Sequence, residues 1–388
     1  MPSQDPSRPA ETSSHRTDST VGHRDGIAVE GEAEQGNQFH LGANSGRCPN
    51  RLTGKLRTCM FVRAMIVSRH EPAIYAGRRA GRSALKTNDT QPQTSQFGFM
   101  IPGSTLTGSA DLNPDWVRDI SPEDMALIAQ AAERLGYDNL ACSEHVGIPP
   151  EVEMVRGGRY YDPLPVFGYL AAVTSRIRFL TYVLVLGYHH PLAIAKRYGT
   201  LDRMCGGRLV LGVGVGSLKQ EFDLLGLGGA EFKERGPRGD DALRALRASL
   251  GRRRPEYQGP YYSFDDFIID PCAIQQDMPL WIGGRSARSL RRAVELGDGW
   301  APFGLSVVEQ AEMIATARET TAWQARDKPL ALALRHDGML DPLDQPQQAA
   351  DRVGAVFAAG GTQVHVGFAH RARSHFVEQL EALAALKV

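Results

Sequence analysis

From residue 97 to the end of the chain, short apolar runs alternate with amphipathic stretches of helical period. Several of the apolar runs are hydrophobic almost throughout, as expected of strands that are covered on both faces. This alternation predicts repeated β-α units and a parallel sheet. Eight strands are predicted, at residues 97–101, 139–143, 177–185, 208–213, 279–283, 299–302, 330–335 and 363–367.

The helix after the first strand has the clearest boundaries. Ser121 is a favourable N-cap, Pro122 suits the first helical position, and acidic residues follow in the first turn. Apolar residues then recur on one face until Gly136, which is typical of a helix end.

Eight alternating units within residues 96–388 favour a closed (β/α)8 TIM barrel over an open doubly wound sheet, since such barrels need about 250 residues. Residues 257–264 interrupt the alternation between the fourth and fifth strands, and they predict a small β-hairpin insertion.

Residues 1–95 have a different composition, rich in Ser, Gly, Arg, Gln and Thr, with one short apolar patch at 60–67. Such a segment buries too little apolar surface to offset the entropy of ordering it. We predict a disordered N-terminal extension, or sequence upstream of a later start methionine. A transit peptide is the alternative, because arginines flank the patch and acidic residues are few there.

The overall charge is balanced, with 44 Lys and Arg against 44 Asp and Glu, which argues against a nucleic-acid or membrane-surface partner. The five cysteines form no Cys-x-x-Cys pair, and no apolar run reaches the roughly 20 residues of a membrane span. We therefore expect a cytoplasmic protein that acts on a small-molecule substrate.

Candidate catalytic residues follow the second and third strands. In a barrel, chemistry is located at the C-terminal ends of the strands, where Glu144 and His145 provide a carboxylate and an imidazole for proton transfer. A hydrogen-bonded loop histidine is the equal alternative. Tyr188, His189 and His190 follow the next strand, but their spacing does not suit a metal, and we predict none.

The fourth strand leads into the sequence GVGVGS at 212–217. It differs from a dinucleotide-binding fingerprint, because Ser217 stands in place of the third glycine and no helix opens immediately after it. Glycines such as Gly214 and Gly216 either let the backbone approach a flat ring or relieve crowding at the strand end. In the first case we expect Gly214, Gly216 and Ser217 to contact the cofactor.

The fifth strand leads through Gly283 and Gly284 to Arg285 and Ser286, where a helix begins. Free amides at a helix N terminus, a hydroxyl and a cation together suit a phosphate group. An ordinary helix start capped by Ser286 is the alternative, and this stretch alone does not decide between them.

Taken in order, these motifs resemble the bacterial luciferase-like family of flavin- and deazaflavin-dependent oxidoreductases. The matching segments span nearly the whole barrel, and together they are specific although no single one is. They are residues 97–102, 143–145, 201–209, 212–216 with 221–222, and 279–284 with 297–300.

The resemblance implies a deazaflavin (coenzyme F420) or FMN ring at the barrel mouth, with its phosphate at residues 283–286. In the F420 branch the positions of Glu144 and His145 line the ring, and a bulge, here residues 186–188 with Gly187 and Tyr188, supports it. A homodimer is a further expectation from the family. Ser217 replaces the glutamate of F420-dependent sugar-phosphate dehydrogenases, which argues against sugar-phosphate oxidation.

Three functions are therefore open: F420-dependent hydride transfer, FMN-dependent monooxygenation, and cofactor binding without turnover. The glutamate tail of F420 would favour a run of cations, and Arg285, Arg288 and Arg292 provide one. This run favours F420 over FMN as the cofactor.

Overall fold

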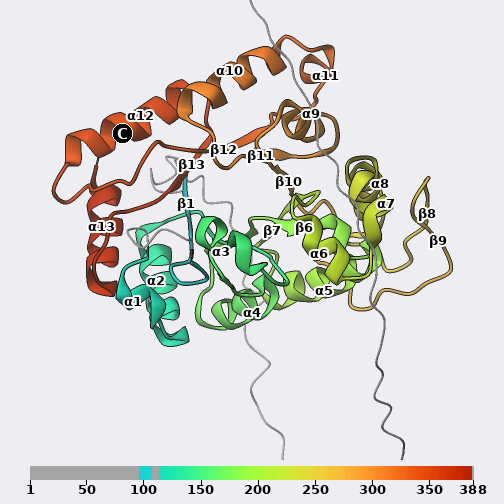
Figure 1. Ribbon diagram of the computed structural model, residues 1–388, viewed down its shortest axis with the longest axis horizontal. Coiled ribbons are helices and arrows are strands. Elements are labelled where there is room, and N and C mark those ends of the chain that lie inside the picture. Colours follow the sequence, from blue (N-terminus) through green and yellow to red (C-terminus); the bar gives the residue numbers. More distant parts are fainter. Residues whose placement is uncertain (1–95, 107–112, 387–388) are drawn as a thin grey trace, which may run out of the picture. The chain divides into compact units, whose positions relative to one another are not determined.

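The computed structural model describes residues 96–106 and 113–386 (Figure 1). The predicted disordered extension, residues 1–95, lies outside this described part. Eight parallel strands form a closed barrel, because β7 pairs with β10 and β13 pairs with β1. The strands are β1 (Phe97–Met100), β3 (Asn139–Cys142), β5 (Arg178–Thr181), β7 (Leu209–Gly214), β10 (Leu280–Gly283), β11 (Gly299–Ala301), β12 (Ala331–Arg335) and β13 (Gln363–Val366). The predicted (β/α)8 barrel is confirmed.

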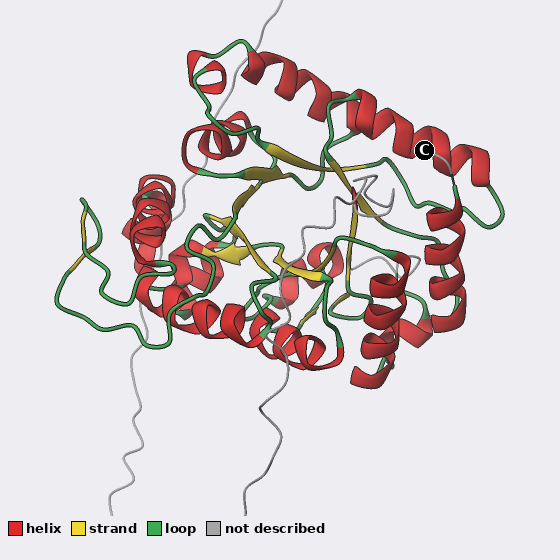
Figure 2. Cartoon of the chain, turned by 180° about the vertical axis from the view of Figure 1, so that it is seen from behind, coloured by secondary structure: helices red, strands yellow, loops and turns green. Residues whose placement is uncertain are grey.

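Long helices surround the strands, as the view from behind in Figure 2 shows. They are α2 (Pro122–Leu135), α4 (Pro163–Val173), α5 (Pro191–Met204), α8 (Arg235–Ser249), α9 (Ala287–Leu296), α10 (Val307–Arg318), α12 (Pro346–Ala358) and α13 (Arg373–Ala385). Short elements lie in the connections: α1 (Asp115–Arg118), α3 (Pro150–Arg156), α6 (Lys219–Leu224), α7 (Gly228–Lys233), α11 (Thr321–Gln324) and the 3-10 turn η3 (Leu186–Tyr188). No described helix has both the length and the apolar character needed to span a bilayer.

Helix α2 begins and ends where the sequence predicted. The Ser121 hydroxyl accepts a hydrogen bond from the Asp124 amide, and the Asp124 carboxylate accepts one from the Ser121 amide. Gly136 ends the helix with φ of 83°, a conformation that costs glycine little. These contacts satisfy backbone groups that a helix end otherwise leaves without partners.

Ser121→Ala is expected to lower the free energy of unfolding by about 1 kcal/mol, because the amide of Asp124 loses its acceptor. The midpoint of urea denaturation measures the effect. Thr316→Ala is the control, since Thr316 is an exposed hydroxyl inside α10 and its loss should cost nothing. Equal midpoints for Ser121→Ala and the wild type would contradict the assignment of the cap.

The third predicted strand, residues 177–185, is not continuous. It divides into β5 and β6 (Leu184–Val185), with Tyr182 and Val183 between them and a cis peptide bond joining these two residues. The Val183 side chain fills the space beside two glycines: a Cβ at Gly283 would lie 2.4 Å from Val183 Cγ1, and one at Gly214 would lie 2.7 Å from Val183 Cγ2. The prediction of a single strand was wrong because this packing draws the chain out of the strand.

The barrel interior is filled mainly by small and apolar side chains. Alternate residues of the strands point inward, and they form a cluster separate from the core beneath the helices. The members of the interior cluster are Ala141, Leu180, Tyr182, Val210, Trp281, Ala301 and Ala333.

The predicted hairpin at residues 257–264 is confirmed. Strands β8 (Tyr257–Gln258) and β9 (Ser263–Phe264) pair antiparallel and lie at the edge of the barrel beside α8 (Figure 1). Asp241 of α8 is buried, and its carboxylate accepts hydrogen bonds from the amides of Tyr261 and Tyr262 at 2.9 and 3.0 Å.

Candidate functional site

The candidate site is built at the C-terminal ends of β3, β5 and β7, where barrel enzymes carry their chemistry. The loop after β3 carries Glu144 and His145, and the segment after β6 carries Tyr188 and His189. Helix α6, which follows β7, adds Glu221.

Glu221 is the centre of a hydrogen-bonded group. Its carboxylate accepts from His145 Nδ1 at 2.7 Å and from Tyr188 Oη at 2.7 Å. It also accepts from the amides of Val146 and Gly147, at 2.7 and 3.3 Å. The Glu221 side chain is only 1% exposed, so these donors replace the water that a carboxylate otherwise needs.

The electrostatics of this group favour an ionised Glu221. Burial raises the pKa of the Glu221 carboxyl, but the hydrogen bonds from His145 and Tyr188 outweigh it and leave this pKa below its usual value. Burial, and then the hydrogen bond to the Glu221 carboxylate, raise the pKa of the Tyr188 hydroxyl, which therefore stays protonated.

His145 is oriented by this carboxylate. Because Nδ1 faces Glu221, we assign the ring proton of the neutral imidazole to Nδ1, which leaves Nε2 as the free acceptor. The ring packs edge-on against Tyr160, with centroids 4.3 Å apart, and the side chain is 17% exposed. His145 thus presents one nitrogen of a fixed imidazole.

Glu144 has its own partners. One oxygen accepts the Val185 amide at 2.6 Å, and the other lies 2.6 Å from His189 Nε2. Glu144 and His145 therefore lie at the same end of the barrel but belong to two separate carboxylate–imidazole pairs. The catalytic roles predicted for both stay predictions.

The remaining histidine of this segment has a structural task. His190 precedes α5, and its Nδ1 accepts the Leu192 amide at 3.2 Å. His189 and His190 thus serve different neighbours, as expected for adjacent residues in extended chain. Within residues 96–106 and 113–386, no group of three or more His, Cys, Asp or Glu side chains is arranged to hold a metal ion.

The glycines predicted to bind cofactor have packing reasons of their own. A Cβ at Gly187 would lie 2.7 Å from the Phe222 ring, and one at Gly216, which has φ of 82°, would lie 2.8 Å from it. Gly214 and Gly283 make room for Val183, as described above. Relief of crowding at these strand ends, one of the two interpretations of the glycine-rich stretch, is therefore supported, and their contact with a ring stays a prediction.

Ser217 is engaged within the protein. Its hydroxyl accepts from the Arg156 guanidinium at 3.3 Å, which links the end of β7 to α3. Helix α6 begins only at Lys219, has six residues and lacks a side-chain cap. A dinucleotide site at this turn is not supported by such a start.

The turn after β10 leads directly into α9. Ser286 is the N-cap: its hydroxyl accepts from the Ser289 amide at 3.3 Å, and the Ser286 amide donates back to Ser289 Oγ at 3.2 Å. Gly284 has φ of 121°, and a Cβ there would lie 2.9 Å from Ser289 Cβ. The helix start capped by Ser286 is therefore confirmed, and the phosphate role of this turn stays a prediction.

The cations near this turn differ in availability. Arg285 and Arg288 are exposed, and neither forms an ion pair within the described part of the chain. Arg292 instead pairs with Asp240, and its side chain is only 11% exposed. Of the predicted run of cations, Arg292 already has a partner within the protein, because the packing of α9 against α8 brings a carboxylate to it.

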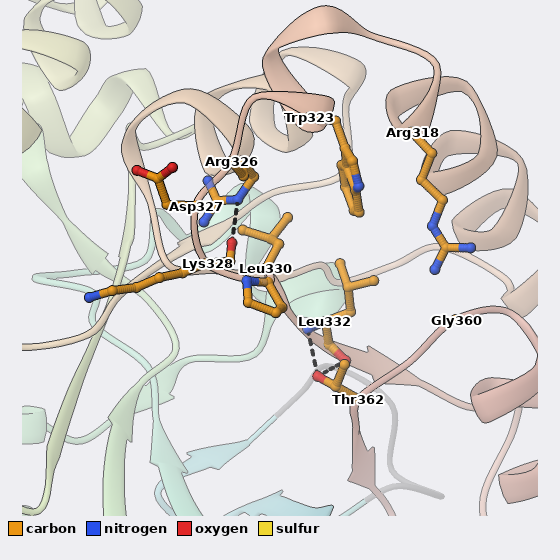
Figure 3. Close-up of a pocket in the computed structure, with 10 residues that line it drawn as sticks. Arg318, Trp323, Arg326, Asp327, Lys328, Leu330, Leu332, Gly360 and Thr362 are labelled. Atoms are coloured by element: carbon orange, nitrogen blue, oxygen red, sulfur yellow. Dashed lines mark hydrogen bonds between the residues drawn. The ribbon is translucent and has the colours of Figure 1, made fainter.

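A hollow lined by Trp323, Arg326, Leu330 and Thr362 lies elsewhere (Figure 3). Leu330 immediately precedes β12 and Thr362 immediately precedes β13, so this hollow is at the N-terminal end of the barrel. In barrel enzymes the residues at the N-terminal end contribute to stability, whereas the catalytic residues lie at the C-terminal end. We therefore place no catalytic function in it.

The sequence contained Glu221 in a family-matching segment and His189 after the third strand, but it gave no signal of the partners of these two residues. Glu221 stands 76 positions after His145, and His189 stands 45 positions after Glu144. No short sequence motif connects residues so far apart. The two carboxylates, Glu221 and Glu144, nevertheless follow strands whose C-terminal ends meet at one rim of the barrel. An inspection of every charged residue near a strand end would have included Glu221.

The sequence profile of the family described as luciferase-like monooxygenase matches residues 95–386, which is most of the chain and the whole barrel. The chain belongs to the luciferase-like family. It is thus a luciferase-like oxidoreductase of an enzyme family that acts on small molecules. The resemblance stated from the motifs is confirmed.

Relatives within this family differ in cofactor. An uncharacterized protein of Mycobacterium tuberculosis is 28% identical over 62% of this chain and 83% of its own length. The F420-dependent glucose-6-phosphate dehydrogenase of Microbacterium testaceum is 33% identical over 46% of this chain and 52% of its own length. The FMNH2-dependent dimethylsulfone monooxygenase of Pseudomonas putida is 25% identical over 54% of this chain and 55% of its own length. These last two matches span only about half of each relative.

The fold is shared with solved structures of low identity. The coenzyme F420-dependent tetrahydromethanopterin reductase from Methanopyrus kandleri superposes with a TM-score of 0.53 at 16% identity, over 75% of this chain and 97% of that one. This likeness supports the barrel architecture and says nothing of the substrate.

Proposed function

We propose that the protein is an F420-dependent oxidoreductase that transfers a hydride to or from a small organic substrate. The observation that carries the proposal is a fixed imidazole, His145 on buried Glu221, at the same barrel end as an anion-ready helix start at α9. The F420-dependent relative at 33% identity supports the same choice of cofactor.

The start of α9 has the donor set that a phosphate needs. The first-turn amides of a helix have no acceptor within the helix, and its dipole favours an anion there. The exposed Arg285 adds a cation, and the exposed Ser286 hydroxyl retains its proton for donation while it caps the helix. A phosphate of F420 or of FMN fits these donors equally well.

The residues at the rim would transfer protons and hold the reacting groups in position. When bound, a deazaflavin supplies hydride transfer and a reduced flavin supplies the activation of oxygen. His145 Nε2 would accept or return a proton, while Glu221 on Nδ1 stabilises the protonated imidazole. Glu144 would hold the backbone after the strand break by accepting the Val185 amide.

FMN-dependent monooxygenation is the second candidate, and the dimethylsulfone monooxygenase relative supports it. Arg285 and Arg288 favour F420, because its tail extends past the phosphate into carboxylates that two exposed cations would attract. A protein that binds cofactor without turnover is the third candidate.

Titration of the full-length chain with F420 and with FMN, followed by fluorescence, distinguishes these candidates. We expect F420 to bind with a dissociation constant in about the micromolar range and FMN more weakly. Micromolar FMN binding without F420 binding would overturn the proposal. F420 binding with no turnover of any carbonyl or alcohol substrate would leave only the third candidate.

Arg285→Ala combined with Ser286→Ala is expected to weaken cofactor binding by about tenfold or more, because a charge-assisted contact and a hydroxyl donor are lost. The same titration measures it. Arg254→Ala is the matched control, since Arg254 is an exposed cation in another loop. An affinity equal to that of the wild type would remove the phosphate anchor from this turn.

A further inference from the structure

A second cation lies inside the barrel, apart from the α9 turn. Arg335 is the last residue of β12, two positions after Ala333, whose side chain belongs to the interior cluster. Since alternate residues of a strand face the same side, Arg335 also points inward at the C-terminal end. It is half-buried, and within the described residues its guanidinium forms no ion pair.

The neighbour of Arg335 on the next strand is a buried histidine. His365 of β13 stands in register with Arg335, so the two side chains share the inner face. His365 is 1% exposed, and neither Nδ1 nor Nε2 has a hydrogen-bond partner. Burial, with the nearby Arg335 charge adding to it, lowers the pKa of His365 to about 3, so the imidazole is neutral and carries one N–H.

Tyr182 completes the group. Its ring stacks on the His365 ring with centroids 4.9 Å apart and planes 30° apart. Its hydroxyl donates to the Pro302 carbonyl and lies against the Arg335 guanidinium as an acceptor. Tyr182 therefore uses its own proton within the protein and fixes the positions of the other two side chains.

The group has more donors than acceptors: Arg335 has the Tyr182 hydroxyl as an acceptor but no carboxylate, and the His365 imidazole has no partner. A buried polar group without a partner costs about 1–3 kcal/mol, so native proteins keep very few of them, and a bound ligand is one explanation for those that persist. Here the donors are a planar guanidinium fork and a neutral imidazole N–H, and no carboxylate within residues 96–106 and 113–386 pairs with the fork. An acceptor with negative charge would complement the guanidinium and would also give the imidazole N–H a partner.

We propose that Arg335 and His365 form a binding site for a carboxylate group of the substrate. A carboxylate matches the guanidinium fork with two parallel hydrogen bonds, and its remaining lone pairs suit the imidazole N–H. This inference rests on the proposed function, since it names the substrate class of the same barrel mouth. The α9 turn stays available for the phosphate of the cofactor, because Arg285 and Arg335 belong to different elements.

Binding of benzoate and of its uncharged counterpart benzamide to the full-length chain tests the site, with ligand-observed NMR as the readout. We expect benzoate to bind about tenfold more tightly than benzamide, because the two differ in charge and little in shape. Equal affinities would overturn the proposal. The F420 and FMN titrations are separate measurements, so failure of the carboxylate site and failure of the proposed function are told apart.

Arg335→Met is expected to weaken benzoate binding by about tenfold, while F420 affinity stays within about twofold of the wild type. Arg335→Lys keeps the positive charge without the planar fork, so its benzoate affinity should lie between those of the wild type and Arg335→Met. Arg254→Met is the matched control at an exposed arginine. An unchanged benzoate affinity in Arg335→Met would overturn the site, and a tenfold loss of F420 affinity instead would assign Arg335 to the cofactor. The wild-type comparison decides the proposal even if Arg335→Met does not fold.

His365→Leu separates a ligand role from a structural one. Leucine has a similar volume and removes two unpartnered nitrogens, so the urea midpoint should stay equal or rise while benzoate binding weakens by about threefold or more. A lower midpoint with unchanged benzoate affinity would make His365 a structural residue and would remove it from the site.

Discussion

Glu221→Ala is expected to lower the free energy of unfolding by about 3 kcal/mol, because it removes a buried carboxylate on which several donors depend. His145 Nδ1, Tyr188 Oη and the Val146 amide would each lose an acceptor in a region where water cannot fully replace it. Urea denaturation of the full-length chain, followed by circular dichroism, measures the shift of the midpoint.

Two variants control this measurement. Glu221→Gln keeps the volume and one acceptor oxygen, so its loss should be smaller than that of Glu221→Ala. Glu312→Ala removes an exposed carboxylate from α10 and should change stability by less than about 0.5 kcal/mol. A Glu221→Ala midpoint equal to that of Glu312→Ala would show that solvent replaces the carboxylate without cost.

The same carboxylate predicts how stability depends on pH. The pKa of Glu221 is lowered in the folded chain, relative to about 4.3 for an unperturbed glutamate. The contribution of ionised Glu221 to the free energy of unfolding is therefore fully present above a pH of about 4.3. It is lost as the pH falls through the pKa of Glu221 in the folded chain. The wild type should lose stability more steeply in this acid range than Glu221→Gln, which has no proton to gain there.

His145→Ala is expected to lower turnover by about 100-fold while the affinity for the cofactor stays within about twofold. The reason is that the His145 imidazole presents Nε2 for proton transfer and is held by Glu221 through Nδ1. The proposed contacts of the cofactor's phosphate and anionic tail do not involve His145. Initial rates of F420 reduction or oxidation, together with the fluorescence titration, give both quantities.

His190→Ala is the matched control for this prediction. His190 lies in the same part of the rim, but its imidazole caps α5 through the Leu192 amide. Its loss should cost stability and leave the turnover of the folded enzyme near that of the wild type. Equal losses of binding and turnover in His145→Ala would make His145 a residue that packs on the ring and not a proton carrier.

The barrel itself was predictable from local information. Strands such as β7 and β10 are apolar runs because both of their faces are covered, and α2 carries its start and end signals in Ser121 and Gly136. The break between β5 and β6 was not predictable, because it depends on Val183 filling space beside Gly214 and Gly283, which are distant in sequence.

By itself, the sequence determined the closed barrel, the hairpin at residues 257–264, the family, and the end of the barrel where Glu144 and His145 lie. These features depend on the hydrophobic periodicity and on residues that are close together in the chain, so the sequence is sufficient to predict them. Only the tertiary structure decided that His145 pairs with Glu221, that Arg292 is neutralised by Asp240, and that Arg335 shares the inner face with an unpartnered His365. Hydrogen bonds and ion pairs act over a few ångströms in space, and closing the barrel brings together residues that the chain holds tens of positions apart.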